Sequence, residues 1–212
     1  MSLESARKPR LWIIAGPNGS GKSTAYGMLK AEETVGSVWI INPDLLAGRI
    51  AEHDQIDLAE ANRLAVERIE AWLYASVAAH QTVGVETVLS TSKYRRLVES
   101  AKANGFSVRM LFVYLDNPDL NVERVKVRVA TGGHAVPEDK IRARWSRSFD
   151  NFAWFLREAD TVDVFNNSGA EPRRVLTKNG NSLTIFDEPV PAMKQALDVA
   201  FGNDMQWVGP AD

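Results

Sequence analysis

Short apolar segments alternate with longer amphipathic segments along most of the chain. Nearly continuous apolar runs occupy positions 11–15, 37–41, 82–89 and 107–115, and a shorter run occupies positions 162–165. Strands that are buried on both faces of a parallel sheet have this composition. We therefore predict that these runs are the strands of a mainly parallel sheet.

The segments between the apolar runs show helical periodicity. The longest, at positions 58–80, repeats apolar residues at helical spacing and places charged residues on the other side. Gly105 is a stop signal after one of the predicted helices. Further helices are predicted at positions 22–30, 92–104, 117–129, 138–156 and 191–201.

The last part of the chain has a different pattern. Asn179 and Gly180 form a strong turn signal between two short apolar segments, at positions 174–177 and 182–186, which predicts a β-hairpin. Alternating strands and helices that end in a hairpin predict an α/β fold with a C-terminal β-hairpin and helix at positions 171–212.

The composition is that of one soluble domain. The chain has 212 residues, 45% hydrophobic and 25% charged, so we predict a single domain over residues 1–212. Its 25 basic and 27 acidic residues give a net charge of -2, which argues against broad binding to nucleic acid. The absence of cysteine excludes thiol nucleophiles, disulfides and cysteine-ligated zinc.

The N-terminal segment points to the cytoplasm. Residues 1–10 are basic and are predicted to form a leader outside the fold. The apolar run at positions 11–15 is too short for a signal peptide or a membrane span. A chain without cysteine also suits a reducing compartment. We therefore expect a cytoplasmic protein with no membrane segment.

A glycine-rich loop follows the first predicted strand and leads into a predicted helix. Its sequence, Gly-Pro-Asn-Gly-Ser-Gly-Lys-Ser at positions 16–23, matches the phosphate-binding pattern G-x-x-x-x-G-K-[ST] in full. Backbone N–H groups of such a loop cradle phosphate oxygens, and the helix N-terminus adds positive charge. A chance glycine-rich turn is the alternative, but the flanking elements argue against it.

The motif defines a set of nucleotide-binding residues. The Lys22 ammonium is expected on the β- and γ-phosphates, and the Ser23 hydroxyl on Mg²⁺. The full predicted set is Gly16, Pro17, Asn18, Gly19, Ser20, Gly21, Lys22, Ser23 and Thr24.

Polar residues stand at the ends of the other predicted strands, where open α/β sheets bind ligands. Asn42 is a candidate substrate-binding residue. Asp44 is a candidate general base for an acceptor hydroxyl or, alternatively, a helix N-cap. Glu86, beside Thr87, is predicted to bind Mg²⁺ or a substrate hydroxyl, because an unpaired buried carboxylate is costly. Pairing of Glu86 with an arginine is the alternative. Asp116 suits a cap or a turn better than a catalytic role.

Two classes of nucleotide-dependent protein lack their signatures here. The chain has no Leu-Ser-Gly-Gly-Gln segment and no apolar run that ends in Asp-Glu, which excludes an ABC transporter ATPase. It has no Asn/Thr-Lys-x-Asp motif for reading guanine, so a signalling GTPase is not expected and ATP is preferred to GTP.

Arginines surround a glycine pair in residues 124–147. Arginines on a mobile flap can stabilise the charge that spreads over a phosphoryl group during transfer. We predict an arginine-bearing helical lid in which Arg124 and Arg128 share one helix face, with Arg124 and Arg142 as candidate nucleotide-binding residues. A solvated basic helix pair without a role is the alternative.

The same region offers two weaker candidates. His134 follows the glycine pair and could contact substrate, although histidines in such loops are more often structural. Aromatic residues farther along could stack on bases, but their spacing suits core packing better. They are Trp145, Phe149, Phe152 and Trp154.

Together these motifs resemble the zeta-toxin family of P-loop kinases, and in particular a bacterial branch labelled predicted ABC-type ATPases. The resemblance covers about residues 10–170 and includes the turn at 166–168. It rests on the loop at 16–24, on Asn42-Pro43-Asp44, on Glu86-Thr87, and on the lid sequences Arg128-x-x-x-Gly132-Gly133-His134-x-Val136-Pro137 and Ile141-x-x-Arg144.

The resemblance implies a monomeric P-loop NTPase fold, a three-layer sandwich, with kinase activity. Zeta toxins phosphorylate UDP-N-acetylglucosamine, which blocks cell-wall synthesis, and are held by a small antitoxin protein. On the matching positions, Lys22 and Ser23 would bind ATP and Mg²⁺, and Asp44 would be the base for the sugar hydroxyl. Glu86 and Thr87 would hold the substrate.

For the lid, the resemblance implies that Arg128, with Arg142 or Arg144, clamps the phosphates. The leading hypothesis is therefore an ATP-dependent kinase that phosphorylates a hydroxyl of a UDP-amino sugar. Two alternatives stay open: a nucleotide or nucleic-acid end kinase, and an ATP-binding switch that engages a partner protein.

Overall fold

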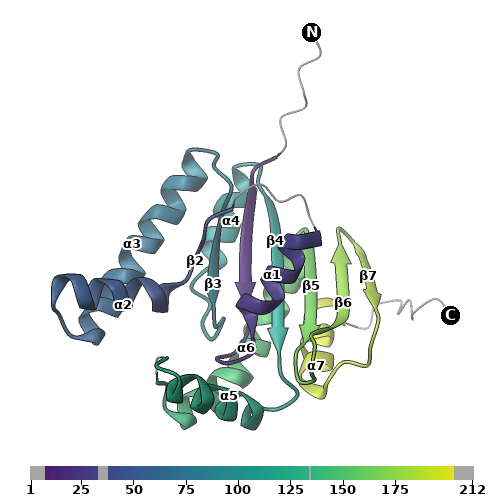
Figure 1. Cartoon of the computed structure of the whole chain (residues 1–212). Coiled ribbons are helices and arrows are strands. Elements are labelled where there is room, and N and C mark those ends of the chain that lie inside the picture. Colours follow the sequence, from purple (N-terminus) through teal and green to yellow (C-terminus); the bar gives the residue numbers. More distant parts are fainter. Residues whose placement is uncertain (1–7, 33–37, 134, 203–212) are drawn as a thin grey trace.

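The computed structural model describes residues 8–32, 38–133 and 135–202, which form one seven-stranded sheet flanked by helices (Figure 1). The strand order is β2-β3-β1-β4-β5-β6-β7, and the first five in this order run parallel. The strands are β1 (Arg10–Ala15), β2 (Ile40–Ile41), β3 (Val83–Thr87), β4 (Ser107–Tyr114), β5 (Thr161–Asn166), β6 (Arg173–Asn179) and β7 (Ser182–Ile185).

The helices connect the parallel strands and cover both faces of the sheet. In Figure 1, α1 lies on the near face, and α4 and α6 lie behind the sheet. The helices are α1 (Lys22–Glu32), α2 (Pro43–Asp54), α3 (Leu58–Ala78), α4 (Arg95–Ala103), α5 (Pro118–Ala130), α6 (Glu138–Glu158) and α7 (Pro191–Phe201). The predicted α/β class, the mainly parallel sheet and the C-terminal hairpin with its helix are confirmed.

Three boundaries differ from the sequence predictions. The leader was predicted to include residue 10, but Arg10 already lies in β1. The second apolar run forms a strand only at Ile40–Ile41, and position 37 lies outside the described residues. The helix α2 was not predicted, although Asn42 and Pro43 are a standard helix start and Leu46, Ala47, Ile50 and Ala51 follow at helical spacing.

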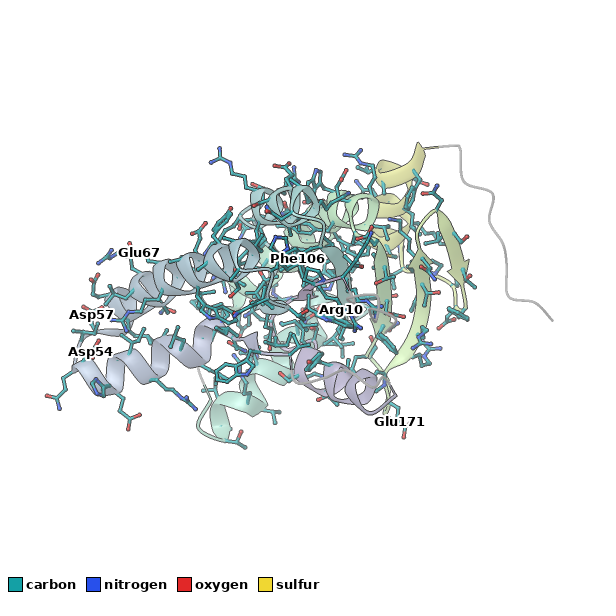
Figure 2. All side chains as sticks on the ribbon, turned by 90° about the horizontal axis from the view of Figure 1, so that it is seen from above. Arg10, Asp54, Asp57, Glu67, Phe106 and Glu171 are labelled. Carbon is teal, nitrogen blue, oxygen red and sulfur yellow. The ribbon has the colours of Figure 1, made fainter. Side chains whose placement is uncertain are left out.

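The helices α2 and α3 form an arm that extends from one edge of the sheet (Figure 1). Their contact surface has a small apolar core of its own, built from Ala47, Ile50, Ala61 and Ala65. Figure 2 shows Asp54, Asp57 and Glu67 on this arm. The base of the arm is the start of α2, so the arm positions Asn42 and Asp44 beside the sheet.

The larger core lies between the sheet and the helices α3, α4, α6 and α7, and its centre is aromatic. Phe112 of β4 stacks on Phe152 of α6 with 4.2 Å between ring centroids, and Phe149 meets Phe112 edge-on at 5.4 Å. Trp145 packs on Phe149 at 4.7 Å. The core interpretation of these aromatic residues is therefore correct, and Phe149 and Phe152 present no surface for base stacking.

We expect Phe112→Ala to lower the free energy of unfolding by about 3–5 kcal/mol, because it removes a fully buried ring from the aromatic cluster and leaves a cavity. Urea unfolding followed by circular dichroism measures this change. Phe186→Ala is the matched control, since that ring is 47% exposed. Equal losses in the two variants would contradict this description of the core.

Among the described residues, no helix is long and apolar enough to span a membrane.

Candidate active site

A cleft of about 420 Å³ lies at the carboxyl edge of the sheet, where β1 and β3 end side by side. The pairing of Ile14 with Glu86 and of Ala15 with Thr87 brings the end of β3 against the glycine loop, and Gly16 N–H donates to Thr87 O at 3.2 Å. Residues lining the cleft include Asn18, Gly19, Lys22, Ser23, Asn42, Asp44, Leu45, Glu86, Thr87, Val88, Ser90, Arg128, Gly133 and Arg144.

The glycine loop has the backbone geometry of a phosphate cradle. Gly19 and Gly21 have φ angles of 73° and 85°, which glycine adopts without strain. Gly16 has a φ of 145°, and a Cβ there would lie 1.9 Å from Val113 O. A side chain at position 16 would therefore push the loop away from β4. These three glycines are required by the fold of the loop.

The Lys22 ammonium lies inside the loop. Its Nζ donates to Gly16 O at 3.0 Å and to Pro17 O at 3.1 Å, and it lies 3.8 Å from a Glu86 carboxylate oxygen. Burial lowers the pKa of Lys22, and the nearby carboxylates of Glu86 and Asp44 oppose that shift. The structure thus places a buried cation among the loop residues.

Ser23 and Glu86 face each other across the start of α1. The Ser23 hydroxyl donates to Glu86 Oε2 at 3.5 Å. Hydroxyl and carboxylate oxygens are the ligands that Mg²⁺ prefers, together with phosphate oxygens. The pair therefore fits a Mg²⁺ ion that is also held by nucleotide phosphates. The alternative interpretation was that Glu86 pairs with an arginine. In this structure its partner is Lys22.

Asn42 and Asp44 have different roles: Asn42 caps α2, and Asp44 lines the cleft. The Asn42 side chain caps α2 by accepting hydrogen bonds from the N–H groups of Asp44 at 2.9 Å and of Leu45 at 3.3 Å. The alternative interpretation of Asp44 as the helix cap is therefore wrong. The exposed Asp44 side chain instead lines the cleft, so its carboxylate can accept a proton from a bound hydroxyl.

The chain turns sharply where β3 leaves the sheet. Leu89 is buried and has a φ of 61°, a strained conformation for a bulky residue. Its N–H donates to the Thr87 hydroxyl at 3.0 Å, and the Ser148 hydroxyl of α6 donates to Val88 O at 2.6 Å. These bonds fix Thr87 and Val88, which line the cleft together with Ser90.

The glycine pair ends α5 and sets the position of Arg128. Gly132 has a φ of 90°, its N–H donates to Val129 O, and the N–H of Gly133 donates to Arg128 O at 2.9 Å. This is a Schellman cap. A Cβ at Gly133 would lie 2.5 Å from Arg128 Cγ, so the second glycine lets the Arg128 side chain fold over the helix end into the cleft.

The other arginines separate into different environments. Arg144 lines the cleft and donates to the Asn18 side chain at 3.3 Å. Arg142 is 45% exposed and pairs with Asp119 on the outside of α5 and α6. Arg124 donates to Asn167 O at 2.7 Å, behind the glycine loop. The structure therefore brings Arg128 and Arg144 together, and not Arg142 or Arg124.

We expect Arg144→Ala to lower kcat/KM for phosphotransfer by about 100-fold, because loss of one donor that stabilises the transition state usually has an effect of this size. We expect Arg142→Ala to lower kcat/KM less than about threefold. A coupled assay of ADP release measures both variants. The reverse order of effects would assign the phosphate contact to Arg142 and contradict the placement seen here.

Some predicted residues have no place in the cleft. Thr24 is exposed on the first turn of α1, outside the cleft lining. His134 lies outside the described residues. Conversely, sequence reasoning missed Leu45, Val88 and Ser90, which line the cleft without any motif to mark them.

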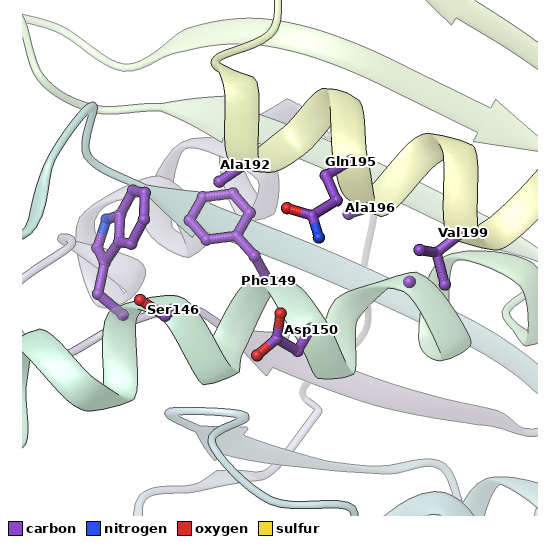
Figure 3. A pocket seen from close by; sticks show the side chains of 9 residues that line it. Ser146, Phe149, Asp150, Ala192, Gln195, Ala196 and Val199 are labelled. Atoms are coloured by element: carbon purple, nitrogen blue, oxygen red, sulfur yellow. The ribbon is translucent and has the colours of Figure 1, made fainter.

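A second hollow, of about 160 Å³, lies between α6 and α7 (Figure 3). Phe149, Ala192 and Ala196 contribute apolar surface to it, and Ser146, Asp150 and Gln195 contribute polar side chains. None of its lining residues also lines the cleft at the sheet edge.

Comparison with protein-family models points to the same family as the glycine loop, the Asp44 position and the two cleft arginines. The family model described as Zeta toxin matches residues 2–172. The chain belongs to the zeta-toxin family. It is therefore a kinase-type phosphotransferase, as the sequence predicted. The match ends before β6, so the hairpin and α7 lie beyond it.

Individual relatives are distant. An uncharacterized protein of Haemophilus influenzae is 27% identical over 146 residues, which cover 65% of this chain and 99% of the relative. The solved PezAT toxin-antitoxin structure of Streptococcus pneumoniae matches with a TM-score of 0.65 at 17% identity, over 93% of this chain and 85% of the other.

A complex of AvrRxo1-ORF1 and AvrRxo1-ORF2 with ATP matches with a TM-score of 0.66 at 16% identity, over 93% of this chain but only 65% of the other. At such identities, these structural likenesses concern the fold alone.

Proposed function

We propose that this zeta-toxin family kinase transfers the γ-phosphoryl group of ATP to a hydroxyl of a UDP-amino sugar, with UDP-N-acetylglucosamine as the leading acceptor. One observation carries the proposal. Residues of the glycine loop and Asp44 line the same cleft, so that a phosphate donor and a hydroxyl acceptor can meet there.

The donor half is the loop with Lys22, Arg128 and Arg144. These three cations line the cleft together with loop residues, and preorganised charges of this kind would stabilise the negative charge that a transferred phosphoryl group gains. Ser23 and Glu86 would hold Mg²⁺. When bound, Mg²⁺ would neutralise charge on the phosphate oxygens.

The acceptor half is the wall formed by Asp44, Leu45 and the segment Thr87–Ser90. Asp44 takes the proton of the acceptor hydroxyl as its oxygen bonds to the γ-phosphorus, and the bond from that phosphorus to the bridging oxygen breaks, releasing ADP. The choice of a UDP-amino sugar rests on the family resemblance. The wall itself, with polar Ser90 and Thr87 beside apolar Leu45 and Val88, suits an amphipathic acceptor.

We further propose a small antitoxin protein as partner of a cytoplasmic monomer. This proposal is supported by the structural relative described as a toxin-antitoxin system and by the complex of AvrRxo1-ORF1 with AvrRxo1-ORF2. Co-purification of this chain with the product of the neighbouring gene tests it.

The acceptor is tested by incubating the purified chain with Mg²⁺ and γ-labelled ATP, and with separate samples of UDP-N-acetylglucosamine, other UDP-sugars, free sugars, nucleosides and oligonucleotides. We expect label on the UDP-amino sugars. Label on nucleosides or oligonucleotide ends instead would establish a nucleotide or nucleic-acid end kinase. ATP binding without transfer to any acceptor would favour the switch interpretation.

A further inference from the structure

Two buried asparagines hold the glycine loop from behind, and neither was predicted as a site residue. Asn121, on α5, is fully buried, and its side-chain Nδ2 donates to Asn18 O at 2.6 Å. Asn167, just after β5, is 7% exposed, and its Nδ2 donates to Ser20 O at 2.8 Å. The two amides thus bind two carbonyl groups of one loop.

The peptide geometry gives these bonds a consequence for the other side of the loop. A trans peptide unit is planar, so its C=O and the following N–H point in opposite directions. When Asn121 holds Asn18 O outward, the N–H of Gly19 faces away from Asn121. When Asn167 holds Ser20 O, the N–H of Gly21 likewise faces away from Asn167. The asparagines therefore orient the N–H groups that a phosphate cradle needs.

Close packing shows that the loop is shaped around the Asn167 side chain and the backbone of α5. A Cβ at Gly21 would lie 2.2 Å from Asn167 Nδ2, and a Cβ at Gly19 would lie 3.0 Å from the backbone carbonyl oxygen of Asn121. Asn167 is itself fixed, because its N–H donates to Tyr114 O at 2.9 Å and its carbonyl accepts from Arg124 at 2.7 Å. The motif glycines at 19 and 21 therefore give α5 and Asn167 room to approach.

We infer that Asn121 and Asn167 are positioning residues that preorganise the loop for nucleotide phosphates. A neutral amide is suited to this task, since it donates to a carbonyl without adding a charge beside the phosphates. The same arrangement gives Arg124 a role other than phosphate binding: it holds the carbonyl of Asn167. The inference rests on nucleotide binding in the proposed function and not on the identity of the acceptor.

The test replaces each amide by an isosteric group that cannot donate. Calorimetric titration with Mg²⁺ and the non-hydrolysable analogue AMP-PNP measures nucleotide affinity for Asn121→Asp and Asn167→Asp. We expect each to weaken binding at least about tenfold, since a carboxylate would face a carbonyl and repel the phosphates. The KM for the acceptor stays within about twofold if orientation of the donor loop is what is lost.

Asn62→Asp is the matched control, because Asn62 also donates through Nδ2 to a backbone carbonyl, Leu58 O at 2.7 Å, but on α3. If an aspartate variant does not fold, Asn121→Ser and Asn167→Ser replace it, because the shorter hydroxyl does not reach the loop carbonyl. Circular dichroism confirms folding at the temperature of titration.

Nucleotide affinity within twofold of the parent in folded variants would overturn the inference, as would an equal loss for acceptor and nucleotide. If the parent chain binds AMP-PNP but phosphorylates no UDP-sugar, the proposed acceptor is wrong and the inference stands. If the parent binds no AMP-PNP, both fail.

Discussion

Replacement of Lys22 by alanine is expected to lower kcat for phosphotransfer by about 1,000-fold or more, because charge stabilisation is the main catalytic contribution in phosphoryl transfer. Lys22 is the buried cation of the glycine loop, 3.8 Å from Glu86 and bonded to the carbonyls of Gly16 and Pro17. Loss of its ammonium leaves the β- and γ-phosphates without that charge. Single-turnover transfer from labelled ATP measures the loss.

Lys102→Ala is the control for Lys22→Ala, because Lys102 is 39% exposed and pairs with Glu158 far from the cleft. We expect this control to retain the parent rate. A Lys22→Ala protein that is folded and transfers phosphate at a rate similar to the parent would show that the glycine loop is not the donor site.

Asp44→Asn is expected to lower kcat by about 100-fold to 10,000-fold, the usual contribution of a positioned general base, while affinity for Mg²⁺ and AMP-PNP stays within about threefold. The amide keeps the size of the side chain but cannot take a proton. Because Asn42 caps α2, the exchange leaves the helix start intact. Steady-state kinetics with saturating ATP and acceptor measures kcat.

Asp54→Asn is the matched control for Asp44→Asn, since Asp54 ends the same helix and pairs with His53 at the exposed end of the arm. A kcat for Asp44→Asn within threefold of the parent would contradict its assignment as the base. A fall in nucleotide affinity equal to the fall in kcat would place Asp44 in the donor half.

The sequence predicted most of the fold because its parallel strands are short apolar runs and its helices start and stop at recognisable residues. The buried pattern of β4, and Gly105 with a φ of 78° after α4, are cases where local signals agree with the structure. The helix α2 was not predicted, although the sequence carries its signals: a start at Asn42 and Pro43, and the apolar residues Leu46, Ala47, Ile50 and Ala51 at helical spacing.

Site residues that belong to a motif could be predicted from the sequence. Site residues that are placed by tertiary contacts could not. The glycine loop, Asp44, Glu86 and Arg128 were found from sequence because their residue types and spacing carry the chemistry. The sequence could not show which of Arg142 and Arg144 reaches the cleft. The two lie two residues apart on one helix, and only the position of α5 distinguishes their surroundings. The same holds for Asn121 and Asn167, which meet the loop from distant parts of the chain.

The central claim is that a phosphoryl donor and a hydroxyl acceptor share the cleft at the sheet edge. Phosphorus NMR of the chain with Mg²⁺, ATP and UDP-N-acetylglucosamine tests it directly, because the spectrum identifies the modified hydroxyl. We predict ADP signals together with a new phosphomonoester signal coupled to a sugar proton. If the parent protein released only inorganic phosphate, or left the spectrum unchanged, the result would contradict the account.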